Sequence, residues 1–290
     1  MAHTARPRRS VLYTPGSNQR ALDKGREIGA DALILDLEDA VAPDAKETAR
    51  RQIVETVKAG GYGHRELAIR VNGLETPWGA DDLQAVATAG AEAVLLPKVE
   101  SAAMVQEAER RLRQAGAPES LRLWCMMETP LGILNAQEIA GASRRLDCLV
   151  MGTSDLVKDL HAAHTALRLP VLTSLSLVLL AARAYGLAAL DGVHLDLADD
   201  EGFRLHCLQG KELGFDGKTL IHPKTVPVAN EIFAPSAAEV AQAEKIIAAH
   251  AAALAEGKGV VLLDGKLIEN LHVESARRLV AEARAIAARG

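Results

Sequence analysis

Two short apolar segments of this sequence each end at a carboxylate beside turn-forming residues. Glu128 directly follows the segment 121–127, and Asp155 follows the segment 148–151 after a Gly-Thr-Ser turn. An apolar segment that stops at an acid and a turn is typical of the C-terminal end of a buried parallel strand, where barrel enzymes keep their chemistry. We therefore interpret Glu128 and Asp155 as two ligands of one divalent cation.

Other charged or polar side chains stand at the ends of further apolar segments. If the ends meet at one mouth, the acids outnumber the bases, and like carboxylates raise one another's pKa. A divalent cation would resolve this excess. With no Cys or His beside Glu128 and Asp155, Mg²⁺ fits better than zinc, and Mn²⁺ is an alternative. The competing interpretation is that each acid caps a helix or pairs with a lysine. The residues at these ends are Asp36, Glu38, Asp39, Arg70, Asn72, Lys98, Glu128, Asp155 and His222.

Arg70 and Lys98 are the two among these residues that carry a positive charge at neutral pH. A guanidinium binds carboxylates through two parallel hydrogen bonds, so Arg70 at the mouth indicates an acidic substrate or a developing oxyanion. A structural salt bridge is the alternative for Arg70. Lys98 is a candidate Schiff-base lysine of a metal-free aldolase, but two acids facing a metal would make that role redundant.

The segment 16–24, after the first apolar run, is a candidate phosphate site. Gly16 and Ser17 could present backbone N–H groups at a helix start, with Arg20 and Lys24 one helical turn apart. The alternative is an ordinary solvated helix face.

Apolar, β-branched segments alternate along the chain with amphipathic segments of helical period, which predicts βα units and a parallel sheet. Three helix-to-strand junctions, beginning at Ile28, Ala89 and Leu213, share a Gly, one residue, an acid and then an apolar run. Glycine suits the left-handed end of a helix. We predict a closed (β/α)8 TIM barrel, class α/β, with strands at Ser10–Thr14, Ala32–Leu37, Leu67–Val71, Ala93–Pro97, Leu121–Met127, Cys148–Met151, Leu190–His194 and Gly217–Ile221.

The chain continues beyond the eighth unit. Ser236 and Glu239 form a capping-box pattern that opens a helix, Asp264-Gly265 is a strong hairpin signal, and a last helix spans about 272–288. We expect a catalytic barrel domain at 1–232 and a C-terminal helix–hairpin–helix extension at 233–290. The extension would cap the barrel or a neighbouring subunit.

Composition excludes several classes of protein. The formal net charge of −5 gives no reason to expect nucleic acid or an anionic membrane as a partner. The 3 cysteines are dispersed and indicate buried thiols in a reducing compartment. The most apolar stretch, 175–182, is far shorter than the ~20 residues of a membrane span. We expect a soluble cytoplasmic protein.

Taken in order, these motifs resemble the HpcH/HpaI aldolase family, in its citrate lyase β-subunit-like branch of malyl-CoA, citramalyl-CoA and citryl lyases. The resemblance covers essentially the whole chain and is specific for the family, not for the substrate. It rests on RSVLYTPGSNQR, ADALILDLEDAVAP, IRVNGLETPWG, LLPKVES, METPLGILNA, MGTSDLVKDL, LDGVHLDLADDEG, GFDGKTLIHPKTVPVANEIFAPS and GKGVVLLDGKLIE.

The resemblance implies a trimeric or hexameric TIM barrel that uses Mg²⁺ to break or form a C–C bond beside a thioester. By motif, Glu128 and Asp155 match the metal ligands, and Glu128 also lies against the substrate. Arg70 matches the substrate-binding arginine. The remaining matches are Glu38 and Asp39 as acids that hold the metal's water molecules, and Tyr13, Arg20 and Lys24 as contacts of the CoA or carrier arm.

One motif departs from the family. Many relatives read GKMID in the C-terminal tail, where the Asp is thought to act as base in the adjacent subunit, and this chain has Glu269 there. The expected activity is Mg²⁺-dependent cleavage of a 3-hydroxy-3-carboxyacyl-CoA, citramalyl-CoA or malyl-CoA, to acetyl-CoA and pyruvate or glyoxylate. Thioester hydrolysis, a citryl-lyase subunit that works with an acyl carrier protein, and an aldolase of free 2-oxo acids remain open.

Overall fold

The computed structural model describes residues 6–289, which form two compact units. One unit comprises residues 8–231. The other combines residues 6–7 with residues 232–289. Each is described by itself.

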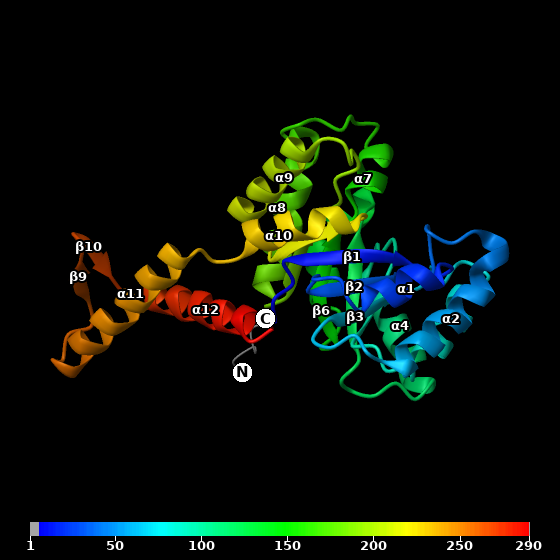
Figure 1. The fold of residues 1–290 in the computed structure, drawn as a ribbon, viewed down its shortest axis with the longest axis horizontal. Coiled ribbons are helices and arrows are strands. Elements are labelled where there is room, and N and C mark those ends of the chain that lie inside the picture. The colour runs from blue at the N-terminus through cyan, green and yellow to red at the C-terminus, as the bar shows by residue number, and fades with distance from the viewer. Residues whose placement is uncertain (1–5, 290) are drawn as a thin grey trace. The chain divides into compact units, whose positions relative to one another are not determined.

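The first unit is a closed barrel of eight parallel strands in sequential order, as the alternating pattern predicts (Figure 1). Each strand pairs with the next, and β1 closes the ring against β8. The register places Asp36 of β2 opposite Arg70 of β3. The strands are β1 (Ser10–Pro15), β2 (Ala32–Asp36), β3 (Glu66–Arg70), β4 (Ala93–Leu96), β5 (Arg122–Met127), β6 (Leu146–Met151), β7 (Ala188–Asp191) and β8 (Gly217–Leu220).

The seventh strand differs from the prediction, because it lies at Ala188–Asp191 and ends before the segment 192–194. The backbone polar groups of Gly192 are used by side chains instead of a neighbouring strand. Its N–H donates to the Asp191 carboxylate at 2.8 Å, and its carbonyl accepts from Lys218 Nζ. The strand stops where these side chains replace the ladder hydrogen bonds.

Helices connect the strands and surround the barrel (Figure 1). In the described part of the chain, none of the helices is both long and apolar enough to cross a membrane. The connecting elements are α1 (Gln19–Gly25), η1 (Pro43–Ala45), α2 (Lys46–Ala59), α3 (Gly79–Val86), α4 (Ala102–Gln114), α5 (Pro130–Leu134), α6 (Ala136–Ala140), α7 (Thr153–Asp159), η2 (Leu169–Val171), α8 (Leu172–Ala184) and α9 (Asp200–Leu213), with η3 (Pro223–Thr225) and α10 (Val226–Phe233) after β8.

The barrel interior is filled by side chains, as alternating strand positions require. Ile34, Leu95 and Trp124 are among the buried residues of this core. At the amino ends of the strands, Arg8 pairs with Glu66 at 2.7 Å, and its guanidinium lies 4.9 Å from the centre of the Trp124 ring. This end of the barrel is therefore closed by a buried ion pair, and the carboxyl ends are left to form a site.

A second buried ion network joins β7, β8 and the segment before α8. The Asp191 carboxylate binds Lys218 Nζ at 2.8 Å and Arg168 Nη1 at 2.7 Å. Asp191 and Lys218 are both 0% exposed. Burial opposes the charge on Asp191, but the two cations outweigh it and lower the pKa of this carboxyl. The network therefore depends on a full negative charge at Asp191.

The second unit consists of two helices joined through a hairpin (Figure 1). The predicted capping box at Ser236 and Glu239 is present, and Asp264-Gly265 turns the hairpin with φ of 51° and 75°, which the Asp-Gly pair favours. Its apolar core includes Ala243, Ala276 and Val280. Its elements are α11 (Ala237–Ala255), β9 (Val261–Leu263), β10 (Lys266–Ile268) and α12 (Asn270–Ala287).

The buried network gives a prediction for stability. Asp191→Asn would leave Lys218 and Arg168 without their counter-ion, and breaking a buried pair costs roughly 3–5 kcal/mol. Urea unfolding followed by circular dichroism should show this loss. Asp216→Asn, which removes a half-exposed partner of Arg183, should cost about 1 kcal/mol or less. Equal urea midpoints for Asp191→Asn and the wild type would contradict the prediction.

Candidate active site

The carboxyl ends of β2 and β3 hold Arg70 in one orientation. Its Nε donates to Asp36 Oδ1 at 2.7 Å and its Nη2 to Asp36 Oδ2 at 2.6 Å, so the pair is bidentate. The Tyr13 ring centre lies 4.9 Å from the guanidinium. Arg70 is only 7% exposed. A charged fork fixed in this way presents its remaining N–H groups without having to reorganise.

Glu38 connects Arg70 to Lys98. One carboxylate oxygen lies 2.9 Å from Arg70 Nη1, and the other accepts from Lys98 Nζ at 3.0 Å. Lys46 fixes the backbone beneath, because its Nζ donates to the carbonyls of Leu37 and Glu38. Burial raises the pKa of Glu38, against the opposing effect of Arg70. Asp39 lies at the rim, 60% exposed and 3.6 Å from Arg70.

Glu128 lies at the end of β5 and is 3% exposed. Its Oε1 accepts the backbone N–H of Lys98 at 2.8 Å. A Cβ atom at Gly152 would lie 2.4 Å from both Cβ and Oε2 of Glu128, so glycine is required there for the carboxylate to fit. Burial and the nearby charge of Glu38 raise the pKa of Glu128 to about 7. The ionised form of Glu128 is therefore unfavourable at this position unless a cation is nearby.

Asp155 reaches the same place from the first turn of α7. Its Oδ2 lies 3.8 Å from Lys98 Nζ, and its side chain is 29% exposed. Asp155 also contributes to the raised pKa of Glu128, since its negative charge disfavours a second one. Lys98 thus touches both predicted metal ligands, one with its backbone and one with its ammonium.

The residues present fit a hard divalent cation that keeps some of its water. Two carboxylates with oxygen donors are what Mg²⁺ commonly takes from a protein. Oγ of Ser154 is buried and has no hydrogen-bond partner among residues 6–289, so it is available to metal-bound water. Within that same range, no three His, Cys, Asp or Glu side chains converge as a complete metal cage. Water and substrate would have to supply the other ligands.

The structure argues against a Schiff-base role for Lys98. Burial works against its charge, but the hydrogen bond and charge of Glu38 outweigh burial and raise the pKa of Lys98 above its ordinary value. A nucleophilic lysine needs a lowered pKa so that the free amine is populated. Lys98 is better described as a cation among carboxylates.

The structure contradicts one part of the predicted phosphate site. The Gly16 N–H donates to the Asp36 carbonyl at 2.8 Å, so the expectation that it faces a phosphate is wrong. A Cβ at Gly16 would lie 2.7 Å from that carbonyl, which explains the glycine as a close strand contact. Arg20 and Lys24 are exposed on α1, as the predicted contact would need. Tyr13 instead faces the barrel interior, where its hydroxyl lies 3.5 Å from Met126 Sδ.

Two other residues named from the sequence lie elsewhere. His222 caps η3, with its Nδ1 accepting the Lys224 N–H at 3.1 Å, so it serves the backbone. Glu269 belongs to the second unit, where its N–H donates to His272 Nδ1 at 3.1 Å. Its role as a base in a neighbouring subunit stays a prediction.

The sequence did not indicate the contacts that three residues make in the site. Asp36 anchors Arg70, Lys98 bridges the carboxylates, and Gly152 makes room for Glu128. Asp36 and Lys98 were visible as strand-end charges, but their pairing depends on strand register. Gly152 carried no signal apart from its place in a turn.

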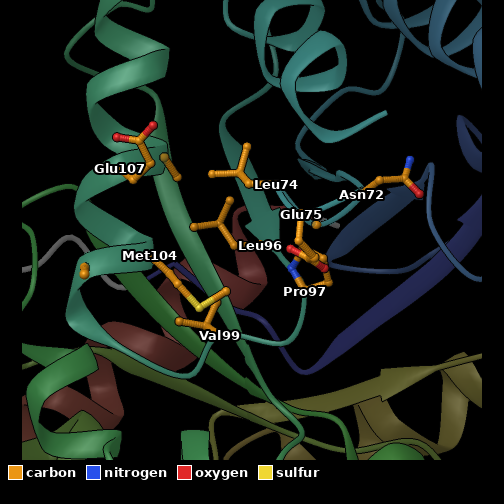
Figure 2. Close-up of a pocket in the computed structure, with 11 residues that line it drawn as sticks. Asn72, Leu74, Glu75, Leu96, Pro97, Val99, Met104 and Glu107 are labelled. Carbon is orange, nitrogen blue, oxygen red and sulfur yellow. The ribbon is translucent and has the colours of Figure 1, made fainter. Parts of the chain in front are cut away.

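A pocket of about 430 Å³ lies between α4 and the segments that follow β3 and β4, with Asn72, Pro97 and Val99 on its wall. Figure 2 shows Leu74, Leu96, Val99 and Met104 close together from different strand ends and α4. Its charged lining residues are the acids Glu75 and Glu107. The pocket therefore suits an apolar group and not a phosphate, which the two carboxylates would repel.

Comparison with known proteins is consistent with this geometry. The family model described as HpcH/HpaI aldolase/citrate lyase matches residues 9–223. The chain is 51% identical to a (3S)-malyl-CoA thioesterase of Cereibacter sphaeroides over 288 residues, 99% of each chain. It is 38% identical to the citrate lyase subunit beta of Escherichia coli over 283 residues, 96% of this chain and 94% of that protein.

A solved relative resembles the whole chain. CitE from Mycobacterium tuberculosis, in complex with magnesium, acetoacetate and coenzyme A, is 30% identical with a TM-score of 0.74 and covers 97% of this chain and 98% of that one. RipC from Yersinia pestis is 32% identical with a TM-score of 0.70, covering 82% of this chain and 100% of that one. The chain, with acids at the mouth of its barrel, therefore belongs to the HpcH/HpaI aldolase/citrate lyase family.

Proposed function

We propose that this chain is a Mg²⁺-dependent enzyme of small 3-hydroxy-3-carboxyacyl-CoA thioesters, with malyl-CoA as substrate and thioester hydrolysis as net reaction. The proposal rests on one observation: the carboxylates of Glu128 and Asp155 both contact Lys98, beside the guanidinium of Arg70 that Asp36 fixes. The relative named (3S)-malyl-CoA thioesterase supports the substrate and the hydrolysis. The CitE complex with magnesium and coenzyme A supports the cation and the thioester.

Glu128 and Asp155 would hold the cation, and Glu38 and Asp39 would hold its water molecules. Bound Mg²⁺ would polarise the substrate oxygens that it contacts and stabilise the negative charge developing on them. The carboxylate of Glu38, fixed by Arg70 and Lys98, and the exposed carboxylate of Asp39 are both suited to accept hydrogen bonds from such water. These residues thus position the substrate's hydroxy acid end.

Arg70 would bind the oxygen on which charge develops. Its bonds to Asp36 and Glu38 leave N–H groups on Nη1 and Nη2 for a substrate carboxylate or oxyanion. Because Asp36 and the Tyr13 ring fix the guanidinium, its orientation costs little when the reaction occurs.

Hydrolysis would add one water molecule across the thioester. The water oxygen bonds to the carbonyl carbon, the C–S bond breaks, and the products are malate and the free CoA thiol. A carboxylate would accept the water proton and return it to the departing sulfur. Glu269 of a neighbouring copy, predicted as the base of C–C cleavage, is the candidate for this step as well. Arg20 and Lys24 would meet the anionic CoA arm. The assembly is predicted to be a homotrimer or hexamer.

Cleavage of the C–C bond is the second candidate, favoured by the family and by the citrate lyase beta relative. Glu269 of a neighbouring copy would take the hydroxyl proton, and the bond between C2 and C3 would break with its electron pair left on C2 as the thioester enolate. Return of the proton to C2 would give acetyl-CoA, released with glyoxylate, or with pyruvate from citramalyl-CoA. In a citrate lyase complex, an acyl carrier protein would replace CoA. An aldolase of free 2-oxo acids is the remaining alternative.

Product analysis tests these reactions directly. Malyl-CoA incubated with the chain and Mg²⁺ should give a free thiol and malate, and EDTA should stop the reaction. Citramalyl-CoA and citryl-CoA should react more slowly, because the relative that is 51% identical to this chain is named for malyl-CoA. Acetyl-CoA and glyoxylate in equal amounts, without free thiol, would decide for the lyase. Turnover restored only by added carrier and transferase partners would indicate a complex subunit.

Removing either proposed ligand should abolish the metal-dependent reaction. Glu128→Gln and Asp155→Asn should each lower turnover about a thousandfold, because several kcal/mol of charge stabilisation are lost. Calorimetry should show weakened Mg²⁺ binding, and circular dichroism should show an intact barrel. Glu138→Gln, an exposed change on α6, is the matched control and should behave as wild type. Near-normal Mg²⁺-dependent turnover in Glu128→Gln would disprove the assignment.

A further inference from the structure

Lys98 has a backbone conformation that its residue type does not favour. Its φ is 46°, in the left-handed region that glycine adopts freely and a lysine rarely adopts. A residue is kept in such a conformation when surrounding interactions fix it, and these residues gather at functional sites. The contacts of Lys98 should therefore explain this conformation.

Both ends of Lys98 are used. In this conformation its N–H donates to Glu128 Oε1 at 2.8 Å, and its Nζ turns back to Glu38 Oε1 at 3.0 Å and Asp155 Oδ2 at 3.8 Å. Glu38 and Asp155 come from different strand ends, β2 and β6. One residue thus fixes one predicted metal ligand through its backbone and balances the charge of the other through its side chain.

The ammonium can leave Asp155 without leaving the site. The Lys98 side chain is 43% exposed on four rotatable bonds, and its contact with Asp155 is longer than its hydrogen bond to Glu38. A dication on the Asp155 oxygens would repel an ammonium at that distance. The ammonium would then stay on Glu38 alone.

We propose that Lys98 is a positioning residue whose ammonium is the built-in counter-ion of the metal site and competes with the divalent cation for Asp155. The inference rests on the proposed function, since it assumes that Glu128 and Asp155 bind the cation. It predicts that the lysine holds the acids together when no metal is bound and that its charge lowers the affinity for the metal. A purely structural lysine would have the opposite effect, because its loss would disorganise the site and weaken binding.

Titration of Mg²⁺ into metal-stripped protein by calorimetry tests the inference without using activity. Lys98→Gln should bind Mg²⁺ about three- to tenfold more tightly than wild type, because a positive charge near the cation is gone. Lys98→Arg, which keeps the charge, should stay within about twofold of wild type. Lys58→Gln, the same charge change at an exposed position in the last turn of α2, should also stay within about twofold.

Thermal unfolding gives a second reading. In EDTA, Lys98→Gln should unfold at a lower temperature than wild type, and saturating Mg²⁺ should raise its Tm by more than it raises that of wild type. Lys98→Gly suits the left-handed backbone and keeps the N–H, so it should repeat the tighter binding if the glutamine variant fails to fold. Unchanged or weaker Mg²⁺ binding in both variants would overturn the inference. Absence of Mg²⁺ binding in the wild type would instead overturn the proposed function.

Discussion

Negative charge gathered at the carboxyl ends of a closed barrel is the constraint on which the rest of this structure depends. Asp36, Glu38, Glu128 and Asp155 approach one another there, and Arg70 and Lys98 are the bases that contact them. Burial raises the pKa of Glu128 to about 7 in spite of Arg70 and the Lys98 N–H. A charged Glu128 is therefore unfavourable at this buried position without a further cation. A divalent cation is the simplest such addition.

The scaffold makes this concentration of charge tolerable. Strand register brings Asp36 opposite Arg70, Gly152 leaves space for the Glu128 carboxylate, and Lys46 fixes the backbone carrying Glu38. Two buried ion networks also stabilise the ring, one at Arg8 at the amino ends of the strands and one at Asp191 at the end of β7. Each charge in these networks has a partner of opposite charge, and this pairing offsets the free-energy cost of burying it.

The architecture could be predicted because it rests on local signals. Apolar runs separated by helical periods, with glycines at their junctions, indicate βα units wherever they occur, and the Asp-Gly hairpin signal is equally local. Errors arose where long-range contacts decided the outcome. Strand β7 ends at Asp191 in part because Lys218, 26 residues further along the chain, donates to the Gly192 carbonyl, and the Gly16 N–H donates to the Asp36 carbonyl. No local sequence pattern reveals either of these contacts.

The same distinction applies to the site. It could be predicted that Glu128, Asp155 and Arg70 lie at one mouth, because side chains at the carboxyl ends of the strands meet there in any barrel of this kind. The left-handed backbone of Lys98 and the bridge it forms between two strand ends were not predictable, since both depend on barrel closure and register. Position along the chain indicated which residues meet, and only their geometry indicated which of them are already paired.

The most direct test of the central claim is a crystal structure of the chain soaked with Mn²⁺, with the ion located by its anomalous scattering. The account predicts one manganese peak between the carboxylates of Glu128 and Asp155, each at about 2.1–2.3 Å from the metal, and the Lys98 ammonium withdrawn toward Glu38. No peak at this position under saturating Mn²⁺, or a peak that Glu128 and Asp155 do not share, would contradict it.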